Sequence, residues 1–127
     1  MPIPRLVLDT SVLVAALRSR RGASFKLLSQ IDAGVFQTAV SVPLVFEYEA
    51  VGKRHARAAG LTHEDIDDVI DYICQVSIQQ GIFYLWRPFL KDPGDDLVLE
   101  LAVAAECDAI VTHNIRDFAG TEGQFQV

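Results

Sequence analysis

The chain has 127 residues, of which 50% are hydrophobic and 22% are charged, a composition that is typical of a globular protein and excludes a disordered one. Its length predicts a single domain over residues 1–127 that can bury a core without disulfides or structural metals. The net charge of −6 excludes a protein that coats nucleic acid through overall positive charge, but it is compatible with an enzyme that binds nucleic acid through local basic residues.

No segment of the sequence predicts a membrane span or a signal peptide. The uncharged stretch at residues 35–46 is too short to cross a bilayer and is interrupted by polar residues. Asp9 lies too early for the apolar region of a signal peptide. The two cysteines, Cys74 and Cys107, lie in apolar runs and are interpreted as small buried side chains. We therefore expect a cytoplasmic protein with no membrane partner.

Strands and helices alternate in the first third of the chain. The apolar run at residues 3–8 predicts a buried strand of a parallel sheet, and residues 35–40 predict a second strand. The spacing of apolar residues predicts helices over residues 12–17 and 23–33, the second of which ends at Gly34. The helices are joined by a basic turn, so the predicted order is strand, helix, helix, strand.

The rest of the chain continues the alternation. Pro43 in the first turn and Gly60 past the end are typical of a long helix, and Thr62 begins a near capping box for the next one. We predict helices over residues 41–59, 62–80 and 95–106, strands over residues 82–86 and 109–112, and the start of a fifth strand at residues 125–127. This order predicts a layered α/β domain around a mostly parallel sheet of four or five strands.

A carboxylate or amide follows each predicted strand. Asp9 ends the first strand, Glu47 lies in the helix after the second, Asp96 starts the helix after the third, and Asn114 and Asp117 follow the fourth. Binding sites of such sheets form outside the carboxyl ends of the strands, so these side chains are candidates for one site. Taken alone, Asp9 is better explained as a helix N-cap, and the last two residues as parts of a turn.

Helical phase separates functional from structural acids in the helix after the second strand. Glu47 shares a face with Leu44 and Tyr48, so it points toward the apolar side of that helix, where a charge is costly unless it is paired or metal-bound. Glu49 points away from that face and has Lys53 four residues on, which predicts an exposed ion pair. We therefore choose Glu47 as the functional residue.

The turn Asp92-Pro-Gly-Asp95-Asp96 carries more acids than a helix N-terminus needs. Asp96 shares a helical face with Leu99 and Glu100, whereas Asp95 or Asp92 is the better candidate for the cap. His113 is interpreted as a surface loop residue. A set of oxygen ligands without cysteine favours Mg²⁺ or Mn²⁺ over zinc, and such an ion can polarise a phosphate and activate a water.

Four stretches of the sequence resemble the motifs of the PIN domain family, and they occur in the family's order along the chain. They are Leu8–Leu13, Ser41–Glu49, Asp92–Ala102 and Ile110–Phe118. The branch that the chain most resembles contains the VapC-like toxins of bacterial and archaeal toxin–antitoxin pairs. The chain departs from the family at Asn114, where many members have aspartate.

The resemblance implies a three-layer α/β/α fold and an endoribonuclease that uses Mg²⁺ or Mn²⁺. The metal-binding and catalytic residues that it implies are Asp9, Glu47 and Asp96, with Asp117, or Asn114 in its stead, at the fourth position. Asp96 is preferred to Asp95 because its interval to Thr112 matches the family's spacing. The resemblance also implies a homodimer and a small antitoxin protein as a partner.

Two groups of residues complete the predicted site. Basic residues that can contact the phosphate backbone of RNA are Arg20, Arg21, Lys53, Arg54 and Arg116. Polar residues in supporting positions of the motifs are Thr10, Ser11, Ser41, Asp95 and Thr112. The alternative to a nuclease is a catalytically weak or inactive PIN module that binds RNA or a protein partner, which the negative net charge and Asn114 favour.

Overall fold

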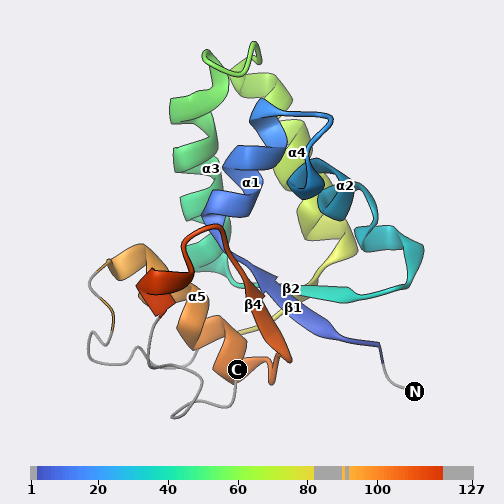
Figure 1. The fold of residues 1–127 in the computed structure, drawn as a ribbon, viewed down its shortest axis with the longest axis vertical. Helices are drawn as coiled ribbons and strands as arrows, with labels where there is room; N and C mark the ends of the chain where they lie inside the picture. Colours follow the sequence, from blue (N-terminus) through green and yellow to red (C-terminus); the bar gives the residue numbers. More distant parts are fainter. Residues whose placement is uncertain (1–2, 82–89, 91, 119–127) are drawn as a thin grey trace.

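The computed structural model of the chain describes residues 3–81, 90 and 92–118. In this part of the chain, four parallel strands form one sheet in the order β3-β2-β1-β4 (Figure 1). The strands are β1 (Arg5–Leu8), β2 (Gln37–Val40), β3 (Ile78–Gln79) and β4 (Ala109–Val111). The parallel register pairs Leu6 with Thr38 of β2 and with Ala109 of β4. All four strands therefore end at the same edge of the sheet.

Five α-helices surround this sheet in the described residues, in the three-layer α/β/α arrangement that the sequence predicted. In Figure 1, α1 to α4 lie together on one side and α5 lies beside β1 and β4. The helices are α1 (Thr10–Arg18), α2 (Ala23–Ser29), α3 (Val42–Ala56), α4 (His63–Val76) and α5 (Pro93–Ala104), with short 3₁₀ helices η1 (Ile31–Ala33) and η2 (Ile115–Phe118). No helix of this part of the chain is long and apolar enough to cross a membrane.

The helix starts follow from local sequence chemistry. Ser41 is the N-cap of α3 and accepts a hydrogen bond from the backbone N–H of Leu44. Thr62 and Asp65 form a reciprocal capping box at the start of α4, with N–H to oxygen distances of 3.0 and 2.8 Å. Asp92 is the N-cap of α5, one of the two positions predicted for it. These caps set where α3 and α5 begin, and hence where their acids lie.

The prediction of a helix over residues 62–80 is wrong at its end. Helix α4 stops at Val76 because Ser77 adopts an extended conformation, and Ile78 and Gln79 then pair with β2 as strand β3. The Ser77 hydroxyl lies 2.6 Å from that of Thr38 on β2, which ties this turn to the sheet. The predicted strands at residues 82–86 and 125–127 lie outside the described residues.

The helix predicted over residues 23–33 is two shorter elements, α2 and η1, and the second ends at Gly34, whose φ of 80° is strained for other residues.

The core of the domain is built from apolar side chains of the sheet and helices. Val7, Leu44 and Leu101 are fully buried. The buried Tyr48 hydroxyl of α3 donates a hydrogen bond to the carbonyl oxygen of Leu8 at the end of β1. This bond fixes α3 against the strand that carries Asp9.

Candidate active site

A cavity of about 720 Å³ lies where β1 and β4 end, between α1, α3 and the first turn of α5. It brings together side chains from segments that are far apart in the sequence. Its lining residues are Asp9, Thr10, Ser11, Val14, Ala15, Arg18, Glu47, Val51, Arg54, Asp92, Asp95, His113, Asn114 and Asp117. The concentration of acids at the carboxyl edge of a parallel sheet makes this cavity the candidate active site.

Asp9 is buried and its carboxylate is held by two hydroxyl groups. Ser11 and Thr112 each donate a hydrogen bond of 2.7 Å to its Oδ2 atom. Asp9 occupies the N-cap position of α1, but its side chain makes no capping hydrogen bond. The structural explanation of this residue as a cap is therefore not supported, and Ser11 and Thr112 have the supporting role that was predicted for them.

Glu47 points from α3 into the same cavity, as its helical phase predicted. The Thr10 hydroxyl donates a hydrogen bond of 2.9 Å to Glu47 Oε2, and Oε1 lies against the backbone of Gly94, where an added Cβ would be only 2.0 Å away. Burial raises the pKa of Glu47, and the nearby charges of Asp9 and Asp92 raise it further, whereas Thr10 and Arg54 lower it. Glu49, in contrast, pairs with Lys53 at 2.9 Å, as predicted.

The structure places Asp95 in the lining of the cavity, whereas Asp96, which we chose from the sequence, is not among the lining residues. Asp96 is buried, and its Oδ1 accepts a hydrogen bond of 2.9 Å from the backbone N–H of Leu90. The physical reason is helical phase, since consecutive residues of a helix point about 100° apart. The face that Asp96 shares with the buried Leu99 and Glu100 is directed into the domain.

Asp95 lies in the field of several other acids. Burial, followed by the charges of Asp9, Asp92, Asp117 and Glu47, raises its pKa to about 7. Each of these charges disfavours the ionised form of Asp95, so a bound cation would relieve the repulsion. The acids that influence one another across the cavity therefore include Asp95, which the sequence analysis had given only a supporting position.

Both candidates for the fourth position reach the cavity from the segment after β4. Asn114 and Asp117 are exposed and line it, and the N–H of Asp117 donates to the carbonyl oxygen of Asn114 at 3.0 Å. The structure brings the two residues together and does not choose between them. His113 is exposed, as predicted, but its ring also lines the cavity, and its Nε2 lies 2.7 Å from the Ser24 hydroxyl of α2.

The basic residues divide into two groups. Arg54 lines the cavity as predicted, and so does Arg18, which the sequence analysis did not select. Lys53 is instead bound to Glu49 and Asp67 at 2.9 and 3.0 Å, so it ties α3 to α4. The other predicted contacts, Arg20, Arg21 and Arg116, are exposed and do not line the cavity.

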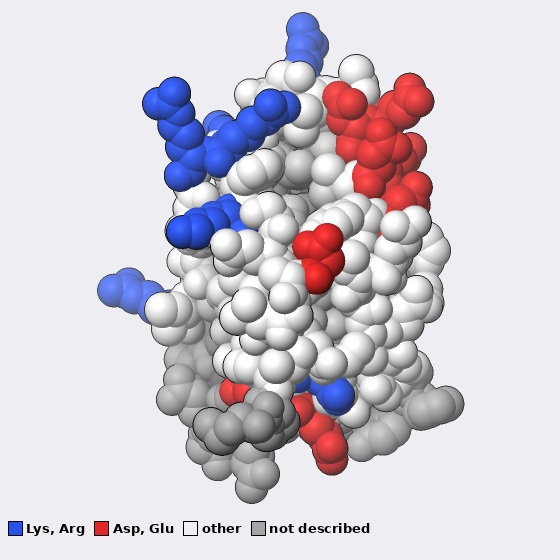
Figure 2. Space-filling model, turned by 90° about the vertical axis from the view of Figure 1, so that its right-hand side faces the viewer, with Lys and Arg blue, Asp and Glu red and all other residues white. Residues whose placement is uncertain are grey.

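Charge is also separated on a larger scale. Figure 2 shows a face on which Lys and Arg lie mainly toward one side and Asp and Glu mainly toward the other. In the described residues, exposed basic side chains concentrate at the end of α1 and in the turn to α2, and exposed acids concentrate on α4. A negative net charge therefore coexists with a local basic region close to the cavity.

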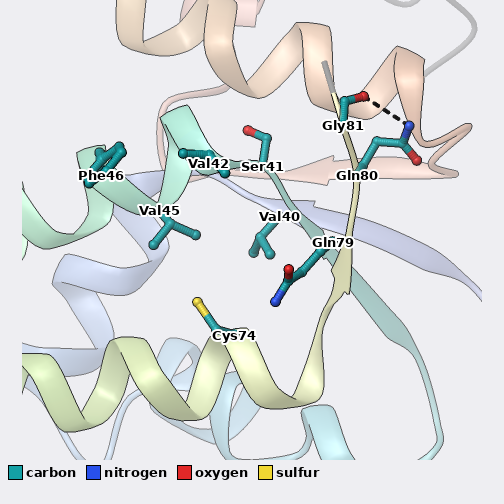
Figure 3. A pocket seen from close by; sticks show the side chains of 9 residues that line it. All are labelled: Val40, Ser41, Val42, Val45, Phe46, Cys74, Gln79, Gln80 and Gly81. Atoms are coloured by element: carbon teal, nitrogen blue, oxygen red, sulfur yellow. Dashed lines mark hydrogen bonds between the residues drawn. The ribbon is translucent and has the colours of Figure 1, made fainter. Parts of the chain in front are cut away.

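Ser41 lies away from the acids. It lines a different pocket, of about 390 Å³, between α3 and β3, and the other labelled side chains of this pocket are mostly apolar (Figure 3). The lining includes the exposed Val42 and Phe46, together with Cys74 and Gln79, but no carboxylate. The supporting role predicted for Ser41 is thus limited to capping α3.

The donor chemistry of the acid-lined cavity fits a hard divalent cation. Carboxylate oxygens of Asp9, Glu47, Asp95 and Asp117 and the amide of Asn114 are the ligand types that Mg²⁺ and Mn²⁺ prefer. Within the described part of the chain, no three His, Cys, Asp or Glu side chains converge closely enough to bind one ion in their present positions. The acids therefore fit such an ion by type and location, and binding would require movements of their side chains.

Comparison with known families identifies this architecture. A family model for the PIN domain matches residues 5–116. The protein belongs to the PIN domain family. PIN domains are generally nucleases, and these nucleases usually use divalent metal ions. Comparison with curated proteins and with solved structures gave no match.

Proposed function

We propose that this PIN domain is an endoribonuclease that hydrolyses RNA phosphodiester bonds with Mg²⁺ or Mn²⁺. The observation that carries the proposal is the gathering of acids in one cavity, where burial, followed by the charges of the other acids, raises the pKa of Asp95 to about 7. Acids that repel one another in a cavity are costly to stability unless they serve a ligand, and a divalent cation is the ligand that their chemistry favours. The PIN family membership supports a nuclease as the outcome.

Within this proposal, Asp9, Glu47 and Asp95 hold the metal ion, with Asp117 or Asn114 at the fourth position. The bound ion would polarise a phosphate and lower the pKa of a water. Ser11 and Thr112 fix the orientation of the Asp9 carboxylate, and Thr10 fixes that of Glu47. Such hydrogen bonds hold the carboxylates in orientations from which they can bind an ion.

The test is cleavage of a single-stranded RNA with Mg²⁺ or Mn²⁺, together with Mn²⁺ binding by calorimetry. We expect Asp9→Asn and Asp95→Asn each to lose about 10-fold or more in metal affinity and activity, since the loss of even a residue that only hydrogen-bonds to a metal ligand costs about 10- to 100-fold. Asp96→Asn is the matched comparison, because it changes the neighbouring acid that faces the protein interior. Circular dichroism verifies that each variant is folded.

Three results would contradict parts of the proposal. Equal cleavage by wild type and Asp9→Asn would show that the metal site is assigned wrongly. A larger loss in Asp96→Asn than in Asp95→Asn, with both folded, would restore the choice made from the sequence. If wild type and variants bind RNA but none of them cleaves it, the alternative of a non-catalytic module is favoured. Asn114, which stands where many members of the family have aspartate, supports that alternative.

We also propose that the protein acts in the cytoplasm as the toxin of a toxin–antitoxin pair, as a homodimer that a small antitoxin silences. The resemblance of the four motifs supports the toxin role and these partners. Free Cys74 and Cys107 are compatible with a reducing compartment. Expression of wild type and Asp9→Asn should arrest growth only with wild type, and light scattering should give the mass of a dimer.

A further inference from the structure

The acid-lined cavity does not end at the carboxylates. Helices α1 and α3 pack side by side, and both run away from the sheet (Figure 1). Each contributes an arginine to the lining of the cavity. On α1 the cavity is lined by Ser11, Val14 and Arg18. On α3 it is lined by Glu47 and by two residues farther along the helix, Val51 and Arg54.

The lining residues of α1 and those of α3 have the same spacing along their helices and begin at the same level. Arg18 follows Ser11, and Arg54 follows Glu47, by seven residues, which is about two helical turns and about 10 Å along each axis. The hydrogen bond of 2.9 Å from Thr10 to Glu47 fixes the helices against each other at the acidic end. The backbone positions of Arg18 and Arg54 therefore lie at a similar level, about two helical turns beyond the acidic end of each helix.

The two arginines are available for a ligand. Among the described residues, neither Arg18 nor Arg54 forms an ion pair, whereas the adjacent Lys53 binds two carboxylates. Both arginines are exposed. A guanidinium group presents a planar fork of donors that matches phosphate oxygens, so two such groups in the lining of one cavity make a phosphate site.

The cavity between the acids and the arginines has an apolar wall. Val14, Ala15 and Val51 line this middle part and are each partly exposed. An apolar surface can pack against the sugar or base of an unpaired nucleotide, while a duplex hides its base faces in the stack. The sequence of acid, apolar and basic surfaces along the cavity thus suits an unpaired nucleic acid strand.

We infer that Arg18 and Arg54 bind a second phosphate of a single-stranded RNA, while the scissile phosphate lies at the acids and the intervening nucleotide packs on Val14 and Val51. This inference rests on the proposed ribonuclease function. The two helical turns between the acids and the arginines, about 10 Å along the helix axes, place the second phosphate within about three nucleotides of the scissile one. The enzyme therefore requires a substrate longer than a dinucleotide for full binding.

The experiment measures binding of fluorescein-labelled oligoribonucleotides by anisotropy in EDTA, so that binding is separated from cleavage. The variants are Arg18→Gln and Arg54→Gln, and the control is Arg57→Gln, which changes the exposed C-cap residue of α3 that does not line the cavity. We expect the two cavity variants to bind about 10-fold more weakly, and the slope of log Kd against log salt to fall by about 0.7 for each lost contact. The control should bind like wild type.

Kinetics and substrate chemistry provide the second readout. With a substrate that is cleaved at one position, the cavity variants should raise KM more than they lower kcat. A methylphosphonate within about three nucleotides of the scissile bond should weaken binding by wild type but not by the double variant. A single-stranded substrate should bind more tightly than the same sequence in a duplex.

The outcomes separate this inference from the nuclease proposal. If wild type cleaves RNA but the cavity variants match Arg57→Gln in Kd and KM, the second phosphate site is wrong and the nuclease stands. If no cleavage occurs but the cavity variants bind RNA more weakly than the control, the nuclease proposal fails and the phosphate site stands. Tighter binding of duplex than of single strands would overturn the single-strand assignment.

Discussion

Replacing Asp95 by asparagine removes a charge from the acid-lined cavity without changing the size of the side chain. The pKa of Asp95 is about 7 in the folded protein, against 3.8 for an ordinary aspartate. If it acted in full, this difference in pKa would lower the free energy of unfolding by about 4 kcal/mol once Asp95 is ionised. Because Asp95 is only partly buried, solvent screening reduces the effect to about 1–2 kcal/mol. The Asp95→Asn variant should therefore be more stable than wild type at pH 8 by about that amount.

The sign of the effect depends on pH. Between about pH 4 and pH 7, folded Asp95 retains a proton that the unfolded chain has released, so the free energy of unfolding falls as the pH rises through this window. Below pH 4 both states are protonated, and wild type and Asp95→Asn should be equally stable. Above pH 7 the full destabilisation is present in wild type. The gain in the variant should accordingly grow from pH 4 to pH 8.

The assay is urea denaturation followed by circular dichroism at pH 4, 6 and 8, without divalent metal. Asp68→Asn, which removes an exposed acid of α4, is the matched control and should retain the pH dependence of wild type. A stability difference between wild type and Asp95→Asn that is the same at all three pH values would refute the reasoning. So would a variant that is less stable than wild type at pH 8.

Three further substitutions test individual contacts. Gly94→Ala places a Cβ where the Glu47 carboxylate now lies, so Mn²⁺ affinity measured by calorimetry should fall about 10-fold or more. The circular dichroism spectrum should stay unchanged, and an unchanged Mn²⁺ affinity would contradict the close approach of Glu47 to Gly94. Tyr48→Phe leaves the Leu8 carbonyl oxygen without this partner and should cost about 1–3 kcal/mol in urea denaturation; a neutral effect would mean that the bond is dispensable. Ser41→Ala removes the N-cap of α3 and should cost about 1 kcal/mol in the same assay, while a loss of Mn²⁺ binding would contradict its purely structural role.

Sequence patterns were most informative about the residues of the cavity where the local signals were strong. Asp9 follows an apolar run that can only be a buried strand, and the phase of Glu47 is fixed by Leu44 and Tyr48, which are both buried. The sequence did not predict that Asp95, and not Asp96, lines the cavity, because this depends on the direction of two adjacent side chains. Helix α5 also begins at Pro93, two residues before the predicted start, and such boundaries are the least certain part of a sequence-based prediction.

Other errors arose from contacts between distant segments. The apolar position at Ile78 continues the helical period of α4, so only its pairing with β2 reveals a strand. Lys53 looked available for RNA because its second partner, Asp67, lies on another helix. Arg18 belongs to the cavity because α1 and α3 lie in register, which local sequence does not encode.

The acids of the cavity come from four segments, at residues 9, 47, 92–95 and 117, which only the folded chain brings together. A cation that these carboxylates gather can therefore bind the native state but has no comparable site on the unfolded chain. At a concentration of 100 times its Kd, such a ligand adds about 2.7 kcal/mol to the free energy of unfolding. The supply of metal in the cell would then govern the lifetime of the protein against proteolysis as well as its activity, so depletion of metal would lower both together.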